Sequence, residues 1–183
     1  MESRGRARRW PWGVVVPLVL VWLAACTVFL VLPRTDTPTA TDATFFLSSD
    51  GGHEAIETRP DLRIGQVVVS RPASVASWSV FTVCDEPGII CVTPAPETTQ
   101  GEAEAFARLA EERDWTSVTV VSQTSHVTRT RILMGRCFPG TVRVVAIPER
   151  GPLIWVWRFV YETGAMVKTA VTPGCHDRLP WER

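Results

Sequence analysis

The feature that most constrains this chain is a run of 21 residues without a charged side chain, from Trp12 to Leu32. At a helical rise of about 1.5 Å per residue, this run is long enough to cross a hydrocarbon core of about 30 Å. Pro17 is compatible with that interpretation, because membrane helices tolerate proline, and Trp10 and Trp12 lie where an interfacial aromatic belt would be. The run therefore predicts a transmembrane helix.

Four arginines and one glutamate lie within the first nine residues. Because basic flanks tend to stay in the cytoplasm, we expect residues 1–11 inside the cell and the chain after Leu32 outside a bacterial cell membrane. Two alternatives stay open. A cleavable signal peptide has the same pattern, and Leu23-Ala24-Ala25-Cys26 resembles a lipobox, where cleavage would leave a lipidated Cys26. All three interpretations place the remainder outside the cytoplasm.

Residues 33–41 are rich in Pro and Thr, and they predict a linker that lifts a domain of residues 42–183 off the membrane. The chain carries 19 basic and 19 acidic side chains, so removing four arginines and one glutamate from the N-terminus leaves 15 against 18. A domain this close to neutral has no basic stripe for a polyanion. We therefore do not expect nucleic acid as a partner.

The cysteines of the domain form an even set, Cys84, Cys91, Cys137 and Cys175. In an oxidising compartment an even set predicts two disulfides. Proximity favours Cys84 with Cys91, which leaves Cys137 with Cys175, and four inert thiols are the alternative. The sequence has no Cys-x-x-Cys, and its histidines have no ligand spacing, so we expect neither a metal nor another cofactor.

Short apolar runs alternate with helical patterns along the domain. The predicted strands are Ala43–Leu47, Gln66–Val69, Trp78–Val83, Ile89–Val92, Thr116–Val121 and Val142–Ile147. The predicted helices are Thr99–Arg113, opened by a capping box of Thr99 and Glu102, and Ser125–Arg136. Alternation of this kind predicts an α/β fold, with a parallel sheet and helices on its faces.

The last element, Pro152–Val171, is helical in length and rich in aromatic residues. We expect it to pack as a closing core helix, because charges and Gly164 interrupt the apolar run. The alternative is that it rests against the bilayer through Trp155, Trp157 and Tyr161. Within the helix, Arg158 and Glu162 are spaced to form an i,i+4 ion pair.

Three motifs resemble the envelope proteins grouped as SanA, YdcF and ElyC. These motifs are Thr98-Thr99-Gln100-Gly101-Glu102-Ala103, Val120-Val121-Ser122, and the segment from His126 to Arg131. Members of the family similarly show Asn-Thr-x-x-Glu-Ala, a strand ending in Val-Thr-Ser, and His-x-x-Arg-Ala. The segment from Tyr161 to Lys168 is similar to the actinobacterial membrane-anchored branch.

The resemblance implies a Rossmann-like domain with a polar cleft at the carboxyl ends of its strands, and a role in the cell envelope and cell wall. Loops and helix N-termini meet at that edge and suit a phosphate or carboxylate. The implied residues are His126 and Glu102 as catalytic candidates, with Ser48, Asp50, Gly51, Thr98, Thr99, Ser122 and Arg129 as ligand-binding candidates.

The sequence leaves three functions open. The first is a membrane-anchored domain that binds a small anionic ligand. The second is a weak hydrolase or transferase on a phosphorylated or lipid-linked cell-wall precursor, with His126 as general acid or base. The third is a degenerate interaction module, because Thr98 replaces the family asparagine and Ser70-Arg71-Pro72 replaces a Ser-Gly-Gly. Motifs of serine hydrolases, P-loop NTPases and dinucleotide enzymes are missing from the sequence.

Overall fold

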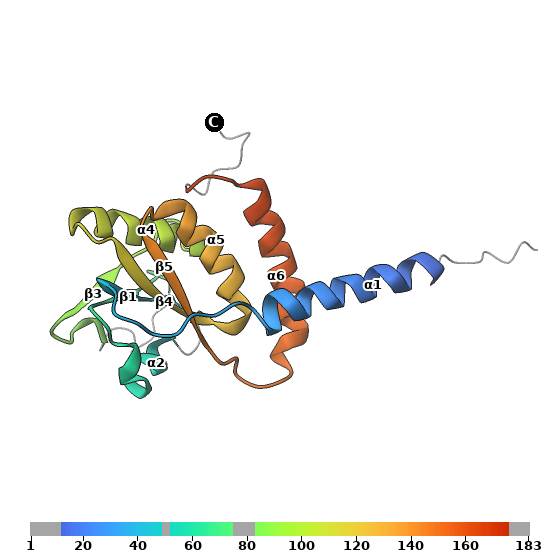
Figure 1. The fold of residues 1–183 in the computed structure, drawn as a ribbon, viewed down its shortest axis with the longest axis horizontal. Coiled ribbons are helices and arrows are strands. Elements are labelled where there is room, and N and C mark those ends of the chain that lie inside the picture. Colours follow the sequence, from blue (N-terminus) through green and yellow to red (C-terminus); the bar gives the residue numbers. More distant parts are fainter. Residues whose placement is uncertain (1–11, 49–51, 75–82, 176–183) are drawn as a thin grey trace, which may run out of the picture.

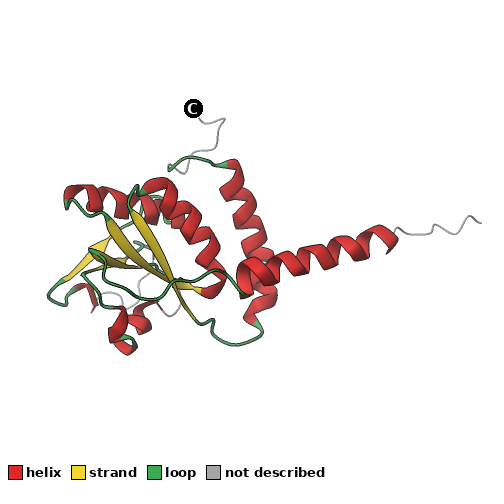
Figure 2. Cartoon of the chain, in the orientation of Figure 1, coloured by secondary structure: helices red, strands yellow, loops and turns green. Residues whose placement is uncertain are grey.

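The computed structural model describes residues 12–48, 52–74 and 83–175, without the side chain of His53. Within these ranges five parallel strands form a sheet in the order β3-β2-β1-β4-β5. The strands are β1 (Ala43–Phe46), β2 (Gln66–Ser70), β3 (Ile89–Val92), β4 (Ser117–Gln123) and β5 (Thr141–Ile147). Helices flank this sheet, as Figure 2 shows, so the predicted Rossmann-like α/β fold is confirmed.

Apolar side chains cover both faces of the sheet. On one face, Phe45 packs with residues of α4 (Thr99–Glu112) and α5 (Val127–Cys137). On the other face, its neighbour Phe46 packs with residues of α2 (Gly52–Thr58) and of the short 3-10 turn η2 (Pro60–Leu62). Successive residues of a strand point to opposite faces, so a strand covered on both sides must be apolar throughout. This explains the consecutive apolar residues Phe45 and Phe46 of β1 and Val67–Val69 of β2, while the buried Thr44 donates its hydroxyl to the Ile64 carbonyl.

Most predicted elements form within one or two residues of their expected limits. The second predicted helix begins as a 3-10 turn, η3 (Thr124–His126), before α5. The sequence pattern does not predict α2. The predicted strand Trp78–Val83 lies outside the described residues except for Val83, which begins a helical turn and is buried.

Both favoured disulfides are confirmed. Cys84 is joined to Cys91, which ties the segment before β3 to that strand. Cys137 is joined to Cys175, which ties the end of α5 to the chain that follows α6 (Ile154–Val171). Cys26 is a buried free cysteine among the described residues.

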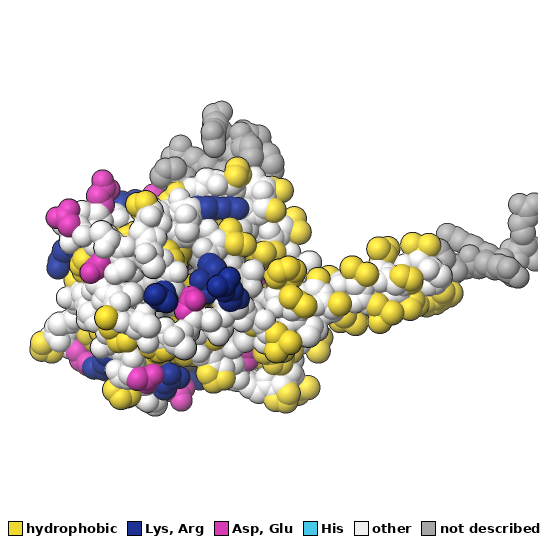
Figure 3. Space-filling view, in the orientation of Figure 1, with side chains coloured by type: hydrophobic (Ala, Val, Ile, Leu, Met, Phe, Trp, Pro, Cys, Tyr) yellow, Lys and Arg dark blue, Asp and Glu magenta, His cyan; other side chains and the backbone are white. Residues whose placement is uncertain are grey.

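The N-terminal helix α1 (Trp12–Cys26) runs through Pro17 and continues as a π-helical turn, η1 (Thr27–Val31). The stretch Trp12–Val31 has a mean hydropathy of 2.8 and is long and apolar enough to cross a membrane. Figure 3 shows it as a rod that carries hydrophobic side chains and projects from the domain. These residues can therefore anchor the chain in a bilayer.

The linker lies along the domain and does not hold it away from α1. The backbone N–H of Asp36 donates to the Val144 carbonyl at 2.9 Å, and the N–H of Val144 donates to the Asp36 carboxylate at 2.8 Å. Arg131 of α5 forms an ion pair with Asp36 at 2.8 Å and also donates to the Arg34 carbonyl. The segment expected to act as a spacer thus fixes the end of η1 to β5 and α5.

The expectation that the last helix is a core helix is wrong. The side chains of α6 that are fully buried are polar, Glu162 and Thr169, and several large apolar side chains remain exposed. The helix runs across α1 (Figure 1) and contacts it through a hydrogen bond of 3.0 Å from the Trp22 indole to the Thr163 hydroxyl. Its apolar residues are thus arranged around α1 and the surface, because the core of the sheet is closed by other elements.

Candidate functional site

A cavity of about 380 Å³ lies at the carboxyl edge of the sheet. It is bordered by Leu47 and Ser48, which follow β1, and by Ser122 and Gln123 at the end of β4. The chain adds β2 and β3 on one side of β1, and then adds β4 and β5 on the other side. The strand order therefore reverses between β1 and β4, where the cavity lies. Open α/β sheets bind their ligands at such a point.

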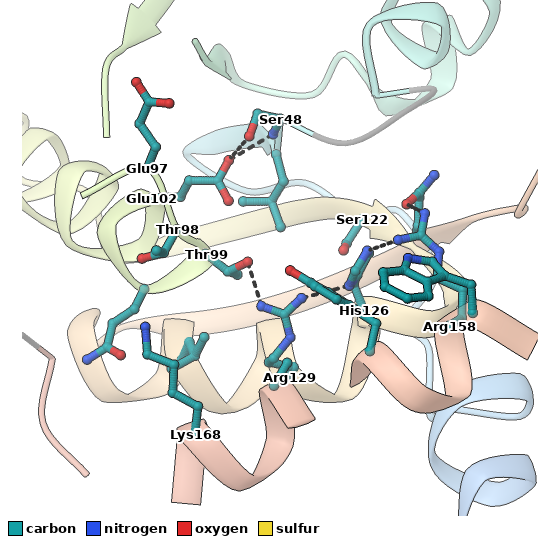
Figure 4. A pocket seen from close by; sticks show the side chains of 17 residues that line it. Ser48, Glu97, Thr98, Thr99, Glu102, Ser122, His126, Arg129, Arg158 and Lys168 are labelled. Carbon is teal, nitrogen blue, oxygen red and sulfur yellow. Dashed lines mark hydrogen bonds between the residues drawn. The ribbon is translucent and has the colours of Figure 1, made fainter. Parts of the chain in front are cut away.

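Three helices complete the wall of the cavity. The lining residues include Thr98, Thr99, Gln100 and Glu102 from the start of α4, His126 and Arg129 from η3 and α5, and Trp157, Arg158, Tyr161 and Lys168 from α6. Figure 4 shows these side chains converging from separate elements. Residues far apart in the sequence thus meet at one edge of the sheet, as the resemblance implied.

The capping box predicted for α4 from Thr99 and Glu102 does not form. The N-cap is Thr98, whose hydroxyl accepts a hydrogen bond of 3.1 Å from the N–H of Gly101. A side chain at Gly101 would collide with the backbone, because its Cβ would lie 1.9 Å from the Pro96 carbonyl oxygen. The close approach packs the first turn of α4 on the segment before it. The positive, N-terminal end of the helix lines the cavity through Thr98, Thr99 and Gln100, where it favours an anion.

Glu102 holds the end of β1 and does not cap its own helix. Its side chain is buried and accepts two hydrogen bonds from Ser48, at 2.8 Å from the backbone N–H and at 2.6 Å from the hydroxyl. Two candidates from the sequence are therefore brought together. Asp50 and Gly51, the other candidates from this loop, lie outside the described residues.

His126 lies between two arginines and a buried carboxylate. Its Nδ1 is 2.6 Å from Oε1 of Glu162, and its Nε2 is 3.0 Å from a terminal nitrogen of Arg158 (Figure 4). Nδ1 also lies 2.8 Å from a terminal nitrogen of Arg129, so it faces both an acceptor and a donor. Nε2 faces only the guanidinium of Arg158, which can only donate, so we assign the lone pair to Nε2 and the ring proton to Nδ1. Both ring nitrogens are thus engaged, and the orientation of the ring is fixed.

Arg129 is also held by Glu162. Its Nε and one terminal nitrogen donate to the two carboxylate oxygens at 2.9 and 3.1 Å, and its other terminal nitrogen donates to the Thr99 hydroxyl at 2.8 Å. This bidentate pair is nearly excluded from solvent, since the side chains of Arg129 and Glu162 are 10% and 0% exposed. Arg129 thereby connects α5 to α6 and to the start of α4.

Burial raises the pKa of Glu162. Hydrogen bonds from His126 and Arg129, together with the positive charge of Arg129, lower it by a larger amount. The net result is a pKa below the usual range of a glutamate. Glu162 therefore stays charged at neutral pH and balances Arg129 inside the protein.

The ion pair predicted between Arg158 and Glu162 does not form. Arg158 donates instead to Gln123 at 2.7 Å and to the carboxylate of Glu149 at 3.2 Å. Glu149 also accepts from the backbone N–H and the hydroxyl of Ser125. The charge of Arg158 is thus balanced from the loop after β5, and that of Arg129 from α6.

Ser122 lies in the cavity wall, as predicted, with its hydroxyl 3.2 Å from the hydroxyl of Thr130. Sequence reasoning missed Gln123, Glu149, Arg158, Glu162 and Lys168 as members of the site. One signal could have indicated Arg158, since charged residues at i,i+4 inside an otherwise apolar helix mark a polar face that needs partners. Gln123 and Glu149 stand in loop or strand-end contexts that carry no such pattern.

Comparisons with family models, with curated proteins and with solved structures find no match to this chain. The fold and the geometry of the cavity are therefore the basis for any functional conclusion. The resemblance to the SanA, YdcF and ElyC proteins stays a prediction from the sequence motifs.

Proposed function

We propose that this chain is a single-pass membrane protein whose extracytoplasmic domain binds a small anionic, phosphate-bearing ligand in the cavity between β1 and β4. The observation that carries the proposal is the meeting, in one cavity, of the N-terminal end of α4 with the cationic groups of Arg129, Arg158 and Lys168. Helix N-termini and arginine or lysine side chains are the groups with which proteins hold phosphate.

The size and lining of the cavity support a small molecule rather than a lone ion. Its volume of about 380 Å³ falls in the lower part of the range of small-molecule sites, roughly 300–1,000 Å³. Trp157 and Tyr161 add aromatic rings to the polar wall. The ligand we propose therefore carries both an anionic group and a less polar part.

The charges around the cavity support a division of roles among the groups that would hold the ligand. The buried carboxylates of Glu162 and Glu149 already balance Arg129 and Arg158, and Glu97 and Glu102 also line the wall. An anion in the cavity would lie near the N-terminal end of α4 and the ammonium group of Lys168, both of which favour negative charge. Arg129 and Arg158 would add directed N–H groups more than net charge.

The extracytoplasmic location has two supports. The apolar helix α1 follows an arginine-rich N-terminus, which favours a cytoplasmic start. The domain carries two disulfides, which persist in oxidising compartments and are rare in the cytoplasm. Thiol labelling of intact cells tests the location, because a domain in the cytoplasm would yield free thiols at these four cysteines.

The binding proposal is tested by calorimetry with inorganic pyrophosphate on the full chain in detergent. We expect saturable binding, and Lys168→Met should weaken it by about tenfold or more, since a hydrogen bond to a charged group contributes roughly 1.5–3 kcal/mol. Arg108→Met is the control, because Arg108 pairs with Glu104 on the exposed face of α4.

Native mass spectrometry of the same full chain, extracted from membranes, would identify an anion that copurifies with it. If the wild-type chain shows neither saturable binding of pyrophosphate nor a copurifying anion, the binding proposal is overturned. That result would favour the interaction module. A role in maintaining the cell envelope and cell wall is part of the proposal, and its support is the motif resemblance.

A second candidate function is hydrolysis or transfer of a phosphorylated or lipid-linked cell-wall precursor. The observation that favours it is the contact of 2.6 Å between Glu162 and His126, because a carboxylate that holds one imidazole nitrogen leaves the other for acid or base chemistry. In this structure Nε2 faces Arg158. Arg158 would have to turn toward a bound anion before Nε2 could accept a proton from substrate.

The enzymatic alternative has its own test. Turnover of a polyprenyl-linked phosphate by the wild-type chain, lost in His126→Ala with ligand binding retained, would support it. Binding without turnover in both proteins would leave ligand binding as the function.

A further inference from the structure

Helix α6 buries polar side chains and exposes apolar ones, which is the reverse of a surface helix in a water-soluble domain. Its buried side chains are Glu162 and Thr169, and Arg158 also faces the protein, where its side chain is only 12% exposed. Its exposed large side chains include a stripe with helical spacing that carries no charge. The large members of this stripe are Leu153, the N-cap residue before the helix, and Val156, Val160, Val167 and Val171 within it, exposed by 46–87%.

An exposed helix in water normally turns charged and polar residues outward. A contiguous apolar surface on a soluble protein marks a place where a partner or a membrane binds. The outer stripe, defined by the five residues above, therefore needs a nonaqueous neighbour. The contact of α6 with the membrane-spanning candidate α1 points to lipid as that neighbour.

The contact between α1 and α6 places α6 beside the apolar segment and not beyond its end. Trp22 donates to Thr163, and its ring meets Phe159 edge-on at 6.3 Å between centroids. Further along the segment, Cys26 and Phe29 line an apolar cavity shared with Met166 of α6. Contacts with α6 thus extend over the second half of the segment.

The helical rise gives the depth in the bilayer at which α1 first contacts α6. The stretch from Trp12 to Val21, before the first contact, covers about 15 Å at 1.5 Å per residue, whereas a hydrocarbon core is about 30 Å thick. A bilayer spanned by α1 and η1 must therefore extend past Trp22, to the level of α6. Figure 1 shows that α6 runs across the direction of α1, which is the orientation of a helix lying in the plane of a membrane.

We propose that α6 lies in the outer leaflet of the bilayer that α1 spans, with the outer stripe in contact with lipid. Amphipathic helices of this kind bury their apolar face about 5–10 Å into the boundary of headgroups and acyl chains. The inference rests on membrane insertion of α1, which belongs to the proposed function. The inference extends the proposed function, because it places the α6 wall of the cavity at the membrane.

The polar side of α6 fits the same placement. Trp157 and Tyr161, exposed by 60% and 47%, lie beside the outer stripe and also line the cavity. Amphipathic rings of this type sit at the level of the headgroups. The depth of α6 then brings the cavity to the membrane surface, with Lys168 on its wall.

The test measures lipid contact at single positions of the full chain in phosphatidylglycerol and phosphatidylethanolamine vesicles. A nitrobenzoxadiazole fluorophore is attached to one introduced cysteine in a Cys26→Ala background, which removes the one free thiol among the described residues. The variants are Val160→Cys on the outer stripe, Leu18→Cys in α1 and Glu111→Cys on the exposed face of α4. The readout is quenching by phosphatidylcholine with a doxyl group on its acyl chain.

We expect quenching and blue-shifted emission at positions 160 and 18, and neither at position 111. Quenching at 18 without quenching at 160 would overturn the lipid contact of α6 and leave the anchor of the proposed function standing. Failure at position 18 would overturn the anchor and this inference together. A label at 160 that is shielded from water and unquenched by lipid, together with an oxidative disulfide between two chains of the unlabelled Val160→Cys variant, would show that another copy covers the stripe, which also overturns lipid contact.

Discussion

The two helices that flank the cavity, α4 and α6, bury opposite kinds of side chain. α4 turns Ala103, Phe106 and Ala110 into the core and exposes charged residues such as Glu111. α6 turns Arg158 and Glu162 inward and exposes valines. Burial of apolar surface from water holds α4, whereas α6 is held by a buried ionic network, by α1 and by the disulfide that follows it. The exposed face of α4 is therefore suited to water, whereas the exposed face of α6 is apolar.

Among the substitutions considered, one on the buried side of α4 should destabilise the protein most. Phe106 is fully buried and stacks on Phe45 with ring centroids 4.9 Å apart, and it also contacts the rings of Trp115 and Phe138. Phe106→Ala should lower the free energy of unfolding by about 3–5 kcal/mol, because a large cavity would remain. Denaturant unfolding of the full chain in detergent measures this loss.

Phe106→Leu is the control for that experiment, since it keeps most of the apolar volume and should cost less than half as much. A loss below about 1 kcal/mol for Phe106→Ala would show that the interior near α4 collapses freely, contrary to a close-packed core.

The next effect lies in the network under α6. Glu162→Gln keeps the shape of the side chain but leaves the charge of Arg129 buried without a counterion. We expect a loss of about 3 kcal/mol in the free energy of unfolding, as is usual when one partner of a buried pair is removed. Glu104→Gln, which removes an exposed i,i+4 partner of Arg108 on α4, should cost less than about 1 kcal/mol. Equal losses in the two variants would contradict the view that α6 depends on its ionic contacts.

Acid should reduce the difference between wild type and Glu162→Gln. Because folding lowers the pKa of Glu162, its charged form stabilises the protein above the ordinary glutamate pKa of about 4.3, and that stability is lost as the pH falls through the folded pKa. Asp36 and Asp42, whose folded pKa values are also lowered, are present in both proteins and cancel. Unfolding curves between pH 7 and pH 3 measure the difference, and a gap that widens toward acid would contradict the assigned role of Glu162.

The fold could be predicted from the sequence where a residue's environment follows from its neighbours in the chain. The runs around Phe45 and Val68 are apolar because both faces of their strands are covered, and the period of α4 marks its buried side. The disulfide pairing followed from proximity and compartment. The short helix α2 carries too few turns to show a period, so the sequence pattern gave no sign of it.

The site was predictable only in part. Thr98, Thr99, Ser122, His126 and Arg129 line one cavity, as the motifs implied. Glu102 was expected to cap its helix, but its carboxylate reaches Ser48, a partner distant in sequence that no local rule provides. The core position expected for α6 was wrong because the helical period shows which residues share a face, not whether water, protein or lipid lies outside that face.

The smallest expected effect lies on the outer stripe of α6. Val160→Ala should change the free energy of unfolding of the full chain in detergent by less than about 0.5 kcal/mol, as for other surface substitutions. The side chain is 58% exposed, so unfolding changes its surroundings little. Val120→Ala, at a fully buried position of β4, is the matched control and should cost on the order of 2 kcal/mol. If both variants lost similar stability, protein would be packed against the stripe, and α6 would be a core helix after all.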